Sequence, residues 1–163
     1  MNIATRLVSY DRCPGDRYRP VATPIYQTAT FEQESALEFG EFDYSRSGNP
    51  TRRVLETQLA ELEGAVGAYA FASGLAALTA VMRLVRPGEE IIANDDLYGG
   101  TYRLLSRFVE PFGVAVKYVD LTDLDAAARA ISGRTRLVHI ETPTNPLQRV
   151  CDIRGLAGLA HKR

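Results

Sequence analysis

The sequence has little of what several classes of protein require. Its two cysteines, Cys13 and Cys151, lie far apart and form neither a metal-binding pair nor a CxxC motif, so we expect two reduced thiols. Its two histidines, His139 and His161, lack the spaced companions that a metal site needs, so we expect no metal. The 19 lysines and arginines nearly balance the 20 aspartates and glutamates, which leaves no broad charge to attract nucleic acid or an anionic membrane.

Long apolar runs are also missing. No uninterrupted apolar run approaches the length of a membrane span, and the first residues, MNIATRLVSYDR, lack the apolar core and cleavage site of a secretory signal. We therefore expect a cytoplasmic protein with neither a nucleic-acid nor a membrane partner. With 45% hydrophobic residues in 163, the chain still has enough apolar material for one sizeable core.

The chain changes character near residue 49. Residues 1–48 are rich in Pro, Arg, Tyr and Thr and show no sustained period, which predicts an extended N-terminal arm. From there Asn49 can cap a helix and Pro50 suits its first turn, while leucines recur on one face until Gly64 ends it. We therefore divide the chain into an arm at 1–48 and an α/β domain at 49–163.

Short apolar strands alternate with helices through the second region. We predict strands at residues 68–72, 90–94, 114–119 and 136–141, and helices at 75–85, 101–109, 124–131 (capped by Thr122) and 153–163. This alternation predicts an α/β fold with a mostly parallel sheet covered by helices on both faces. Because the chain reaches its last residue inside what reads as a crossover helix, we expect the sheet to be incomplete.

Ligands of parallel sheets gather at the carboxyl ends of the strands. This rule predicts that the turn at Ser73-Gly74 and the loops at 95–100 and 141–145 converge on one rim. The turn could hold a phosphate with its backbone N–H groups, although the same residues are common in simple turns. It does not match GxGxxG, so nothing indicates a dinucleotide.

Polar and aromatic side chains near these loops are candidate ligand groups. Tyr44 and Arg46 precede a capped helix, where they could contact phosphate oxygens or be solvated, and such a phosphate could belong to a neighbouring subunit. Tyr98 lies in the 95–100 loop and could either stack on a heteroaromatic ring or pack in the structure. Glu141 and Asn145 flank a rigid Pro-containing segment that can aim polar groups at a ligand.

Four segments together resemble one family in order and nearly in spacing: YSRSGNPT (44–51), FASGLAAL (71–78), DDLYGGT (95–101) and ETPTNP (141–146). The chain is similar, from about residue 23 to its end, to the pyridoxal-phosphate (PLP) enzymes of Cys/Met metabolism, the transsulfuration family. The resemblance implies a fold-type I PLP-dependent transferase-like domain and a sulfur amino-acid substrate such as cystathionine. It also implies a homo-oligomer, built from dimers with shared active sites and expected to be a tetramer.

The resemblance also assigns roles to the candidate residues. It implies that Tyr44 and Arg46 reach the cofactor phosphate of a partner chain, while the turn Ser73, Gly74 and Leu75 holds the phosphate of its own chain. Tyr98 would stack on the pyridine ring and assist the exchange of lysine for substrate.

The remaining assignments concern the substrate side of the site. Asn145 would lie beside the phenolic oxygen of the ring or the substrate carboxylate, and Glu141 would support that loop. Arg103 matches a position near the distal end of the substrate.

The lysine that binds PLP covalently in the family has no match here. The chain has two lysines, Lys117 in the middle of a predicted strand and Lys162 next to the end, and neither matches the family's position. We therefore expect a truncated enzyme that is inactive alone.

The segments look most like cystathionine β-lyases, with cystathionine γ-synthase close behind and cystathionine γ-lyase and methionine γ-lyase as further alternatives. A non-catalytic chain that binds PLP or pairs with a longer homologue is the alternative of another class; an aminotransferase is disfavoured by YSRSGNPT and DDLYGGT.

Overall fold

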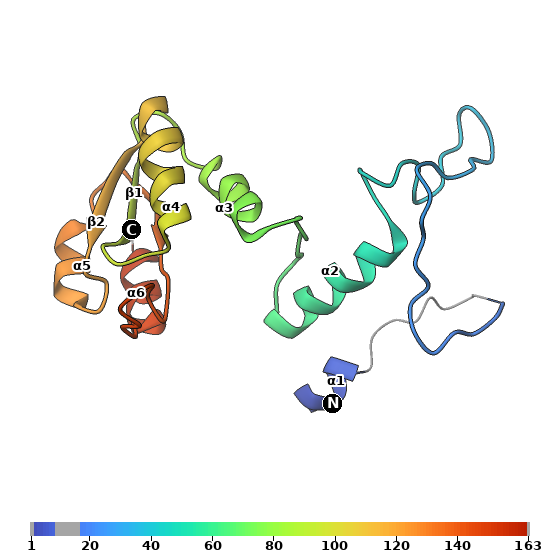
Figure 1. The fold of residues 1–163 in the computed structure, drawn as a ribbon, viewed down its shortest axis with the longest axis horizontal. Helices are drawn as coiled ribbons and strands as arrows, with labels where there is room; N and C mark the ends of the chain where they lie inside the picture. Colours follow the sequence, from blue (N-terminus) through green and yellow to red (C-terminus); the bar gives the residue numbers. More distant parts are fainter. Residues whose placement is uncertain (1, 9–16, 163) are drawn as a thin grey trace. The chain divides into compact units, whose positions relative to one another are not determined.

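The computed structural model describes residues 2–8 and 17–162, so Cys13 lies outside the described residues. The chain divides into two compact units, Met1–Phe71 and Ala72–Arg163. Figure 1 labels the helices and strands of both units. No helix in the described part of the chain is long and apolar enough to cross a membrane.

The first unit contains two helices and a long irregular segment. Helix α1 spans Ile3–Val8 and helix α2 spans Pro50–Glu63. Within the predicted arm, residues 17–48 contain no helix or strand and make one antiparallel bridge, between Thr30 and Tyr44, whereas α1 is a helix that the sequence pattern did not predict.

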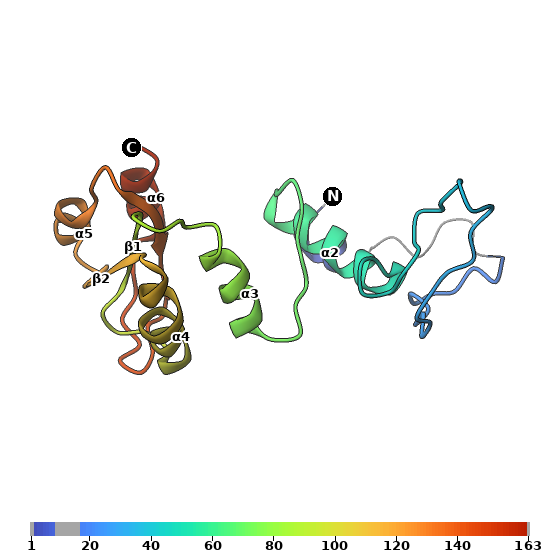
Figure 2. The ribbon, with the colours of Figure 1, turned by 90° about the horizontal axis from the view of Figure 1, so that it is seen from above.

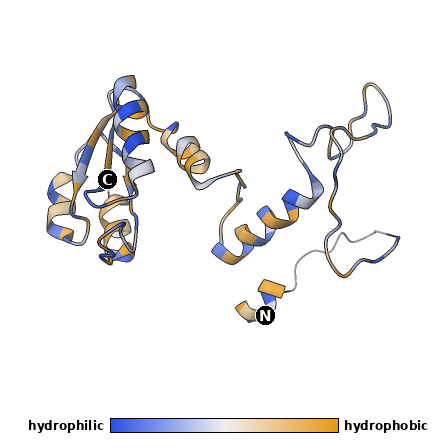
Figure 3. Cartoon of the chain, in the orientation of Figure 1, coloured by the Kyte–Doolittle hydropathy of each residue, from blue (hydrophilic) through white to orange (hydrophobic). Residues whose placement is uncertain are grey.

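The ends of α2 are where the sequence places them. The side chain of Asn49 accepts a hydrogen bond from the backbone N–H of Thr51 at 2.9 Å, and Pro50 occupies the first helical position. Gly64 has a φ of 62°, the left-handed conformation that ends helices and favours glycine. Hydrophilic and hydrophobic residues alternate along α2 in Figure 3, and its Leu55 and Leu59 remain exposed in this unit.

The predicted strand at residues 68–72 is wrong. These residues are extended but pair with no strand among the described residues, and Tyr69 is 84% exposed. A strand requires a neighbour that satisfies its N–H and C=O groups, and an apolar run alone does not supply one. The turn at Ser73 therefore does not follow a paired strand.

The second unit is a parallel three-stranded sheet. Its strands are β1 (Glu90–Asn94), β2 (Ala115–Val119) and β3 (Thr135–His139), in the order β2-β1-β3. Both neighbours of β1 run parallel to it, and Ala93 lies between Tyr118 and His139 in the register. The α/β class and the parallel, incomplete sheet are confirmed.

Helices cover both faces of this sheet, as Figures 1 and 2 show with α4 on one face and α6 on the other. Ile91 and Ala93 pack toward α3 (Gly74–Met82) and α4 (Gly99–Leu104), the latter continuing as a π-helical turn at Leu105–Val109 and a 3₁₀ turn at Glu110–Phe112. Ile92 packs on the other face toward α5 (Leu124–Ala130) and α6 (Ile153–Ala160). Each fully buried isoleucine or leucine contributes about 1.5–3 kcal/mol of apolar burial, so this alternation along β1 holds the two layers together.

Several predicted boundaries differ from the structure, among them those of the helix at 75–85, which spans Gly74–Met82, and of the strand at 136–141, which spans Thr135–His139. Asp123, not Thr122, caps α5: its Oδ1 accepts from the N–H groups of Asp125 and Ala126 at 2.8 and 3.1 Å. The hydroxyl of Thr122 instead donates to Asp120 at 2.6 Å, so it is not available as a cap. The helix predicted at 101–109 begins two residues earlier, at Gly99.

Candidate functional site

Two of the three predicted loops meet at the carboxyl edge of the sheet. The backbone N–H of Tyr98 lies 3.1 Å from both carboxylate oxygens of Glu141, and the N–H of Glu141 donates to the Oδ1 of Asn94 at 2.8 Å. Asn94 ends β1 and Glu141 follows β3, so these bonds join the loops that leave two neighbouring strands. The predicted convergence of the 95–100 and 141–145 loops is confirmed.

The ring of Tyr98 lies against Gly100. A Cβ atom built on Gly100 would be 2.2 Å from the Cε1 of Tyr98, so this close approach requires glycine. The Tyr98 side chain is nevertheless 50% exposed. The Tyr98 ring therefore packs against the backbone at Gly100 and is still exposed enough for a planar ligand to stack on it.

The segment after β3 presents Asn145. Asn145 is exposed, and its side-chain amide makes no hydrogen bond to any described residue. Its neighbours are fixed: the N–H of Thr144 donates to the carbonyl of Arg149 at 2.9 Å, and the N–H of Gln148 donates to the carbonyl of Thr144 at 3.0 Å. These backbone hydrogen bonds hold the loop, so the side-chain amide of Asn145 stays at the edge of the sheet and is available to a ligand.

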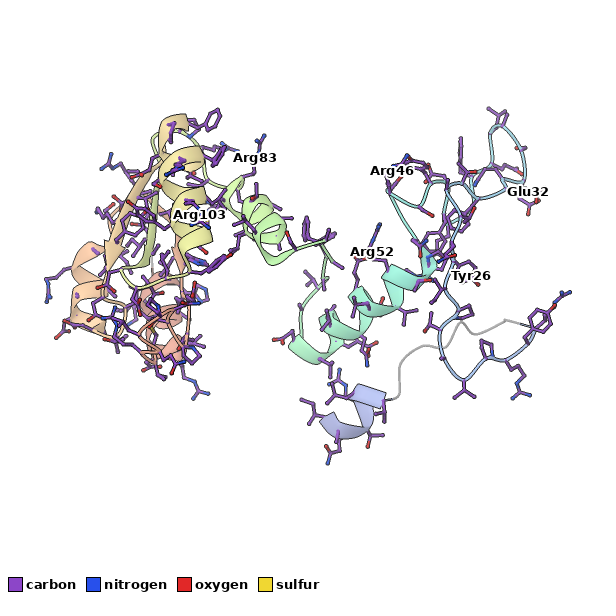
Figure 4. The ribbon with its side chains drawn as sticks, in the orientation of Figure 1. Tyr26, Glu32, Arg46, Arg52, Arg83 and Arg103 are labelled. Atoms are coloured by element: carbon purple, nitrogen blue, oxygen red, sulfur yellow. The ribbon has the colours of Figure 1, made fainter. Side chains whose placement is uncertain are left out.

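Arg103 is a second uncommitted polar group in this unit. It lies on α4 (Figure 4), is exposed, and forms no ion pair with a described residue. Its Nη1 would be 3.5 Å from a Cβ on Gly99, so the guanidinium lies beside the start of the helix that carries the Tyr98 loop.

The turn at Ser73 offers two free backbone donors. The hydroxyl of Ser73 accepts from the N–H of Ala76 at 3.2 Å and caps α3, while the N–H groups of Gly74 and Leu75 donate to no described acceptor. A Cβ on Gly74 would meet nothing within 4 Å, so the space in front of these groups is open. No hydrogen bond joins this turn to the loops of Tyr98 or Glu141 in the described part of the chain. The start of α3 fits a phosphate group, because unpaired N–H groups and the helix dipole both favour an anion.

Tyr44 and Arg46 lie together in the first unit. The guanidinium carbon of Arg46 is 4.2 Å from the centroid of the Tyr44 ring, a cation–π contact, and Arg46 is exposed (Figure 4). Backbone bonds hold the segment, since the N–H of Ser45 donates to the carbonyl of Ala29 at 2.9 Å. The two side chains that could bind a phosphate are therefore adjacent on an exposed loop.

Neither lysine is placed for covalent binding of PLP. Lys117 donates to the carbonyl of Ala130 at 3.0 Å and lies 2.9 Å from the buried carboxylate of Glu90. Glu90 begins β1, whereas Tyr98 and Glu141 lie at the opposite, carboxyl end of the sheet. Lys162 is exposed and follows α6.

Arg149, which our sequence reasoning did not single out, pairs with three aspartates. Its side chain bonds Asp95, approaches Asp120 at 3.0 Å and lies 3.9 Å from Asp96. The hydrogen bond that Arg149 donates to Asp95 is the main cause that raises the pKa of Arg149. The only signal in the sequence was the Asp-Asp pair before Tyr98, whose partner lies more than fifty residues away.

Two further groups lie beside the site. Burial lowers the pKa of His139, and nearby Glu141 offsets this only in part, so the imidazole is neutral near pH 7. Cys151 is a buried free thiol whose Sγ accepts from the side-chain amide of Asn94 at 3.4 Å.

Fold and site together define a class: a parallel α/β domain with a helix start suited to phosphate and an exposed tyrosine suited to an aromatic ring. Residues 4–163 match the model of the Cys/Met metabolism PLP-dependent enzymes. The chain belongs to this family, whose cofactor is PLP.

Individual relatives support this assignment. The chain is 52% identical over 160 residues to "Cystathionine beta-lyase, chloroplastic" of Arabidopsis thaliana and 48% identical over 161 residues to "Mimosinase, chloroplastic" of Mimosa pudica, covering 98% of this chain and 34% and 36% of those proteins. It superposes with a TM-score of 0.92 and 35% identity on a cystathionine gamma synthase from Xanthomonas oryzae pv. oryzae, over 99% of this chain and 42% of that one. The chain thus spans about a third of the length of the curated relatives it matches.

Proposed function

We propose that the chain forms the N-terminal part of a cystathionine β-lyase, which splits the C–S bond of cystathionine with PLP. The single observation that carries the choice of reaction is the 52% identity to the Arabidopsis cystathionine β-lyase over nearly the whole chain. A mimosinase is 48% identical to the chain, so relatives of nearly equal similarity carry the names of different enzymes. We therefore propose cystathionine as the substrate and do not infer it from identity alone. The alternatives are cystathionine γ-synthase, cystathionine γ-lyase and methionine γ-lyase.

Each candidate residue has a task in this proposal. The N–H groups of Gly74 and Leu75 bind the PLP phosphate with the capping residue Ser73, because they are unpaired and open to solvent. Tyr98 stacks on the pyridine ring, and its loop is held by Glu141. When bound, PLP withdraws electrons from the α-carbon of an amino acid, which allows a bond at the β-carbon to break.

The substrate is oriented by two further groups. Asn145 offers an uncommitted amide to the ring oxygen or to the substrate carboxylate, and Arg103 offers a cation to the distal end of cystathionine. A guanidinium suits that end because it carries a carboxylate, which a planar fork of donors can bind in a bidentate manner.

The covalent lysine is supplied from outside residues 1–163 in this proposal. Lys117 is engaged by Glu90 at the opposite end of the sheet, and the chain spans only 32–39% of its curated β-lyase relatives. We therefore propose that the chain alone is inactive. The same engagement of Lys117 favours, as a second candidate, a non-catalytic chain that binds PLP weakly or pairs with a longer homologue.

The arrangement of subunits is also a proposal. We propose that residues 1–48 form an arm whose Tyr44 and Arg46 reach the phosphate of a neighbouring subunit, and that 49–163 form the N-terminal part of the PLP domain. Their adjacency on an exposed loop supports this, since their side chains form no hydrogen bond or ion pair with a described residue of their own unit. A dimer with shared sites, assembled into a tetramer in the cytoplasm, follows from it; the plant relatives are named chloroplastic, so the location needs its own test.

A chimera tests the function. Residues 1–163 would be joined to the remaining part of the Xanthomonas cystathionine γ-synthase, which supplies a lysine, and incubated with cystathionine and PLP. Release of pyruvate with a free thiol marks β-elimination, whereas 2-oxobutyrate marks γ-elimination. Pyruvate from the chimera, but not from residues 1–163 alone, supports the proposal; a folded, PLP-loaded chimera that gives only 2-oxobutyrate overturns the choice of β-lyase.

A further inference from the structure

Arg149 joins the carboxyl ends of all three strands. Asp95 and Asp96 follow β1, Asp120 follows β2, and Arg149 itself lies beyond β3. The Nη2 of Arg149 donates to Asp95, its Nη1 lies 3.0 Å from Asp120, and its Nε lies 3.9 Å from Asp96. One nitrogen of the guanidinium thus donates to Asp95 and a second forms a close ion pair with Asp120, while Nε, which has no hydrogen-bond partner, lies within ion-pair distance of Asp96.

Asp96 extends this network to the two sides of Asn145. The carboxylate of Asp96 is buried and accepts from the hydroxyl of Thr144 and from the N–H of Leu147, the latter at 3.1 Å. The same Thr144 hydroxyl accepts from the N–H of Arg149 at 2.9 Å. Because Thr144 and Leu147 bracket Asn145, and Asp96 lies two residues before Tyr98, one carboxylate connects both ligand-facing loops.

Arg149 is the member of this network that offsets the negative charges of Asp95, Asp96 and Asp120. Three carboxylates face one another here, and without a cation they repel at short range in a partly buried setting. Among the described residues, the other groups that donate to these carboxylates are N–H groups and the hydroxyls of Thr144 and Thr122, which carry no charge. A lysine could offer only a point charge, whereas the planar fork of arginine reaches several acceptors in fixed directions.

We infer that Arg149 is a positioning residue that fixes the Asn145 loop against the Tyr98 loop. The geometry stands by itself, and only its consequence for PLP binding rests on the proposed function. Arg149 does not need to touch cofactor or substrate, because it acts through Asp96 and Thr144.

Amide hydrogen exchange of the folded chain tests the inference. In Arg149→Gln we expect exchange at the N–H groups of Leu147 and Tyr98 to accelerate roughly ten- to hundredfold, as expected for the loss of charge-assisted hydrogen bonds, while Ile91 and Ile92 of β1 stay protected. Arg149→Lys should fall between Arg149→Gln and the unaltered chain. The matched control is Arg136→Gln, because Arg136 is exposed on β3 and forms no ion pair with a described residue.

A milder variant keeps the test decisive if Arg149→Gln does not fold. Asp120→Asn removes one arm of the network without stranding a buried charge, and we expect a smaller acceleration at the same two amides. Unchanged exchange at Leu147 and Tyr98 in a folded variant overturns the inference, and so does an equal acceleration throughout β1, which would indicate general destabilisation.

A second readout separates this inference from the proposed function. In the chimera, PLP release from Arg149→Gln is expected to be faster than from Arg136→Gln. Accelerated exchange together with unchanged PLP release would retain Arg149 as the residue that positions the loops and would count against the proposed roles of Tyr98 and Asn145 at PLP.

Discussion

The backbone N–H of Tyr98 lies 3.1 Å from both carboxylate oxygens of Glu141. One carboxylate therefore holds the loop after β1 from across the sheet edge, and the tyrosine side chain is left free to face outward. Because Glu141 in turn donates its own N–H to Asn94, the two loops are bonded in both directions. This reciprocal arrangement explains how an exposed ring can be held in one place.

Removing the carboxylate should loosen this loop. We expect Glu141→Ala to lower the free energy of unfolding by about 1–2 kcal/mol, because the Tyr98 N–H loses a charged acceptor. Glu141→Gln should cost less than half as much, since its carbonyl oxygen can still accept. Urea unfolding measures both, with Glu110→Ala as the control because that exposed carboxylate accepts no hydrogen bond from a described residue. Equal losses for Ala and Gln would contradict this role of Glu141.

Gly100 sets the position of the Tyr98 ring. We expect Gly100→Ala to push the ring away, because the new methyl carbon would lie 2.2 Å from its Cε1. The ring is half exposed and can swing, so the cost in stability should be small, about 1 kcal/mol. NMR shifts of the Tyr98 ring protons report the movement, and Gly133→Ala is the control because a Cβ there meets nothing.

A double mutant isolates the contact between the two residues. In a Tyr98→Ala background the methyl group has no ring to displace, so Gly100→Ala should then cost little or nothing. A cost that persists without the ring would show that the backbone at Gly100, not the tyrosine, requires glycine.

Local chemistry explains which parts of the fold could be predicted. Asn49, Pro50 and Gly64 each act within one helical turn, so the bounds of α2 follow from neighbouring residues alone. The buried run at Glu90–Asn94 likewise identifies a central parallel strand, since both of its faces are covered. Residues 68–72 carry a similar apolar run but have no paired neighbour, and a sequence pattern does not reveal whether a neighbour is present.

The sequence predicts only part of the site. Tyr98, Glu141 and Asn145 were singled out because they lie in loops that follow predicted strands, the resemblance then assigned their roles, and the convergence of their loops followed from parallel strand order. Arg149 lies in none of the segments that carry the resemblance, and its three carboxylate partners are 29 to 54 positions away in the chain. Contacts of that range are set by the tertiary fold, so no local rule could have selected this arginine.

Stability should fall in acid because of Glu90. Burial alone would raise the pKa of this carboxyl, but hydrogen bonds from Lys117, Thr135 and Ser132 outweigh it and leave the pKa lowered. A lowered folded-state pKa means that the stabilisation is present above the unfolded-state pKa of about 4.3 and is lost as the pH falls through the folded-state value. Urea unfolding between pH 7 and pH 3 should show this decline, and Glu90→Gln should flatten part of it. An unchanged pH dependence in Glu90→Gln would exclude Glu90 as its source.

Lys117→Met tests the same pair from the other side. It leaves a fully buried carboxylate that still accepts from the hydroxyls of Ser132 and Thr135, but whose remaining ion-pair partner among the described residues is Arg134, at 3.9 Å. Breaking a buried ion pair costs about 3–5 kcal/mol, and we expect about 2–3 kcal/mol here because the lysine side chain is 42% exposed and solvent screens it. The matched control is Arg129→Met, whose ion pair with Asp123 is long and exposed.

The chain of 163 residues should not hold PLP covalently. Lys117 is bound to Glu90 and Ala130 at the amino end of β1, while Tyr98 and the free amide of Asn145 lie at the carboxyl end, so Lys117 does not face the ring-binding side. After incubation with PLP, borohydride reduction and dialysis, we expect no more cofactor on the unaltered chain than on Lys117→Met. A stable adduct that disappears in Lys117→Met would mean that the Glu90 pair opens and that the proposed site is misplaced. An adduct that survives Lys117→Met would instead direct attention to Lys162, the one other lysine in the sequence.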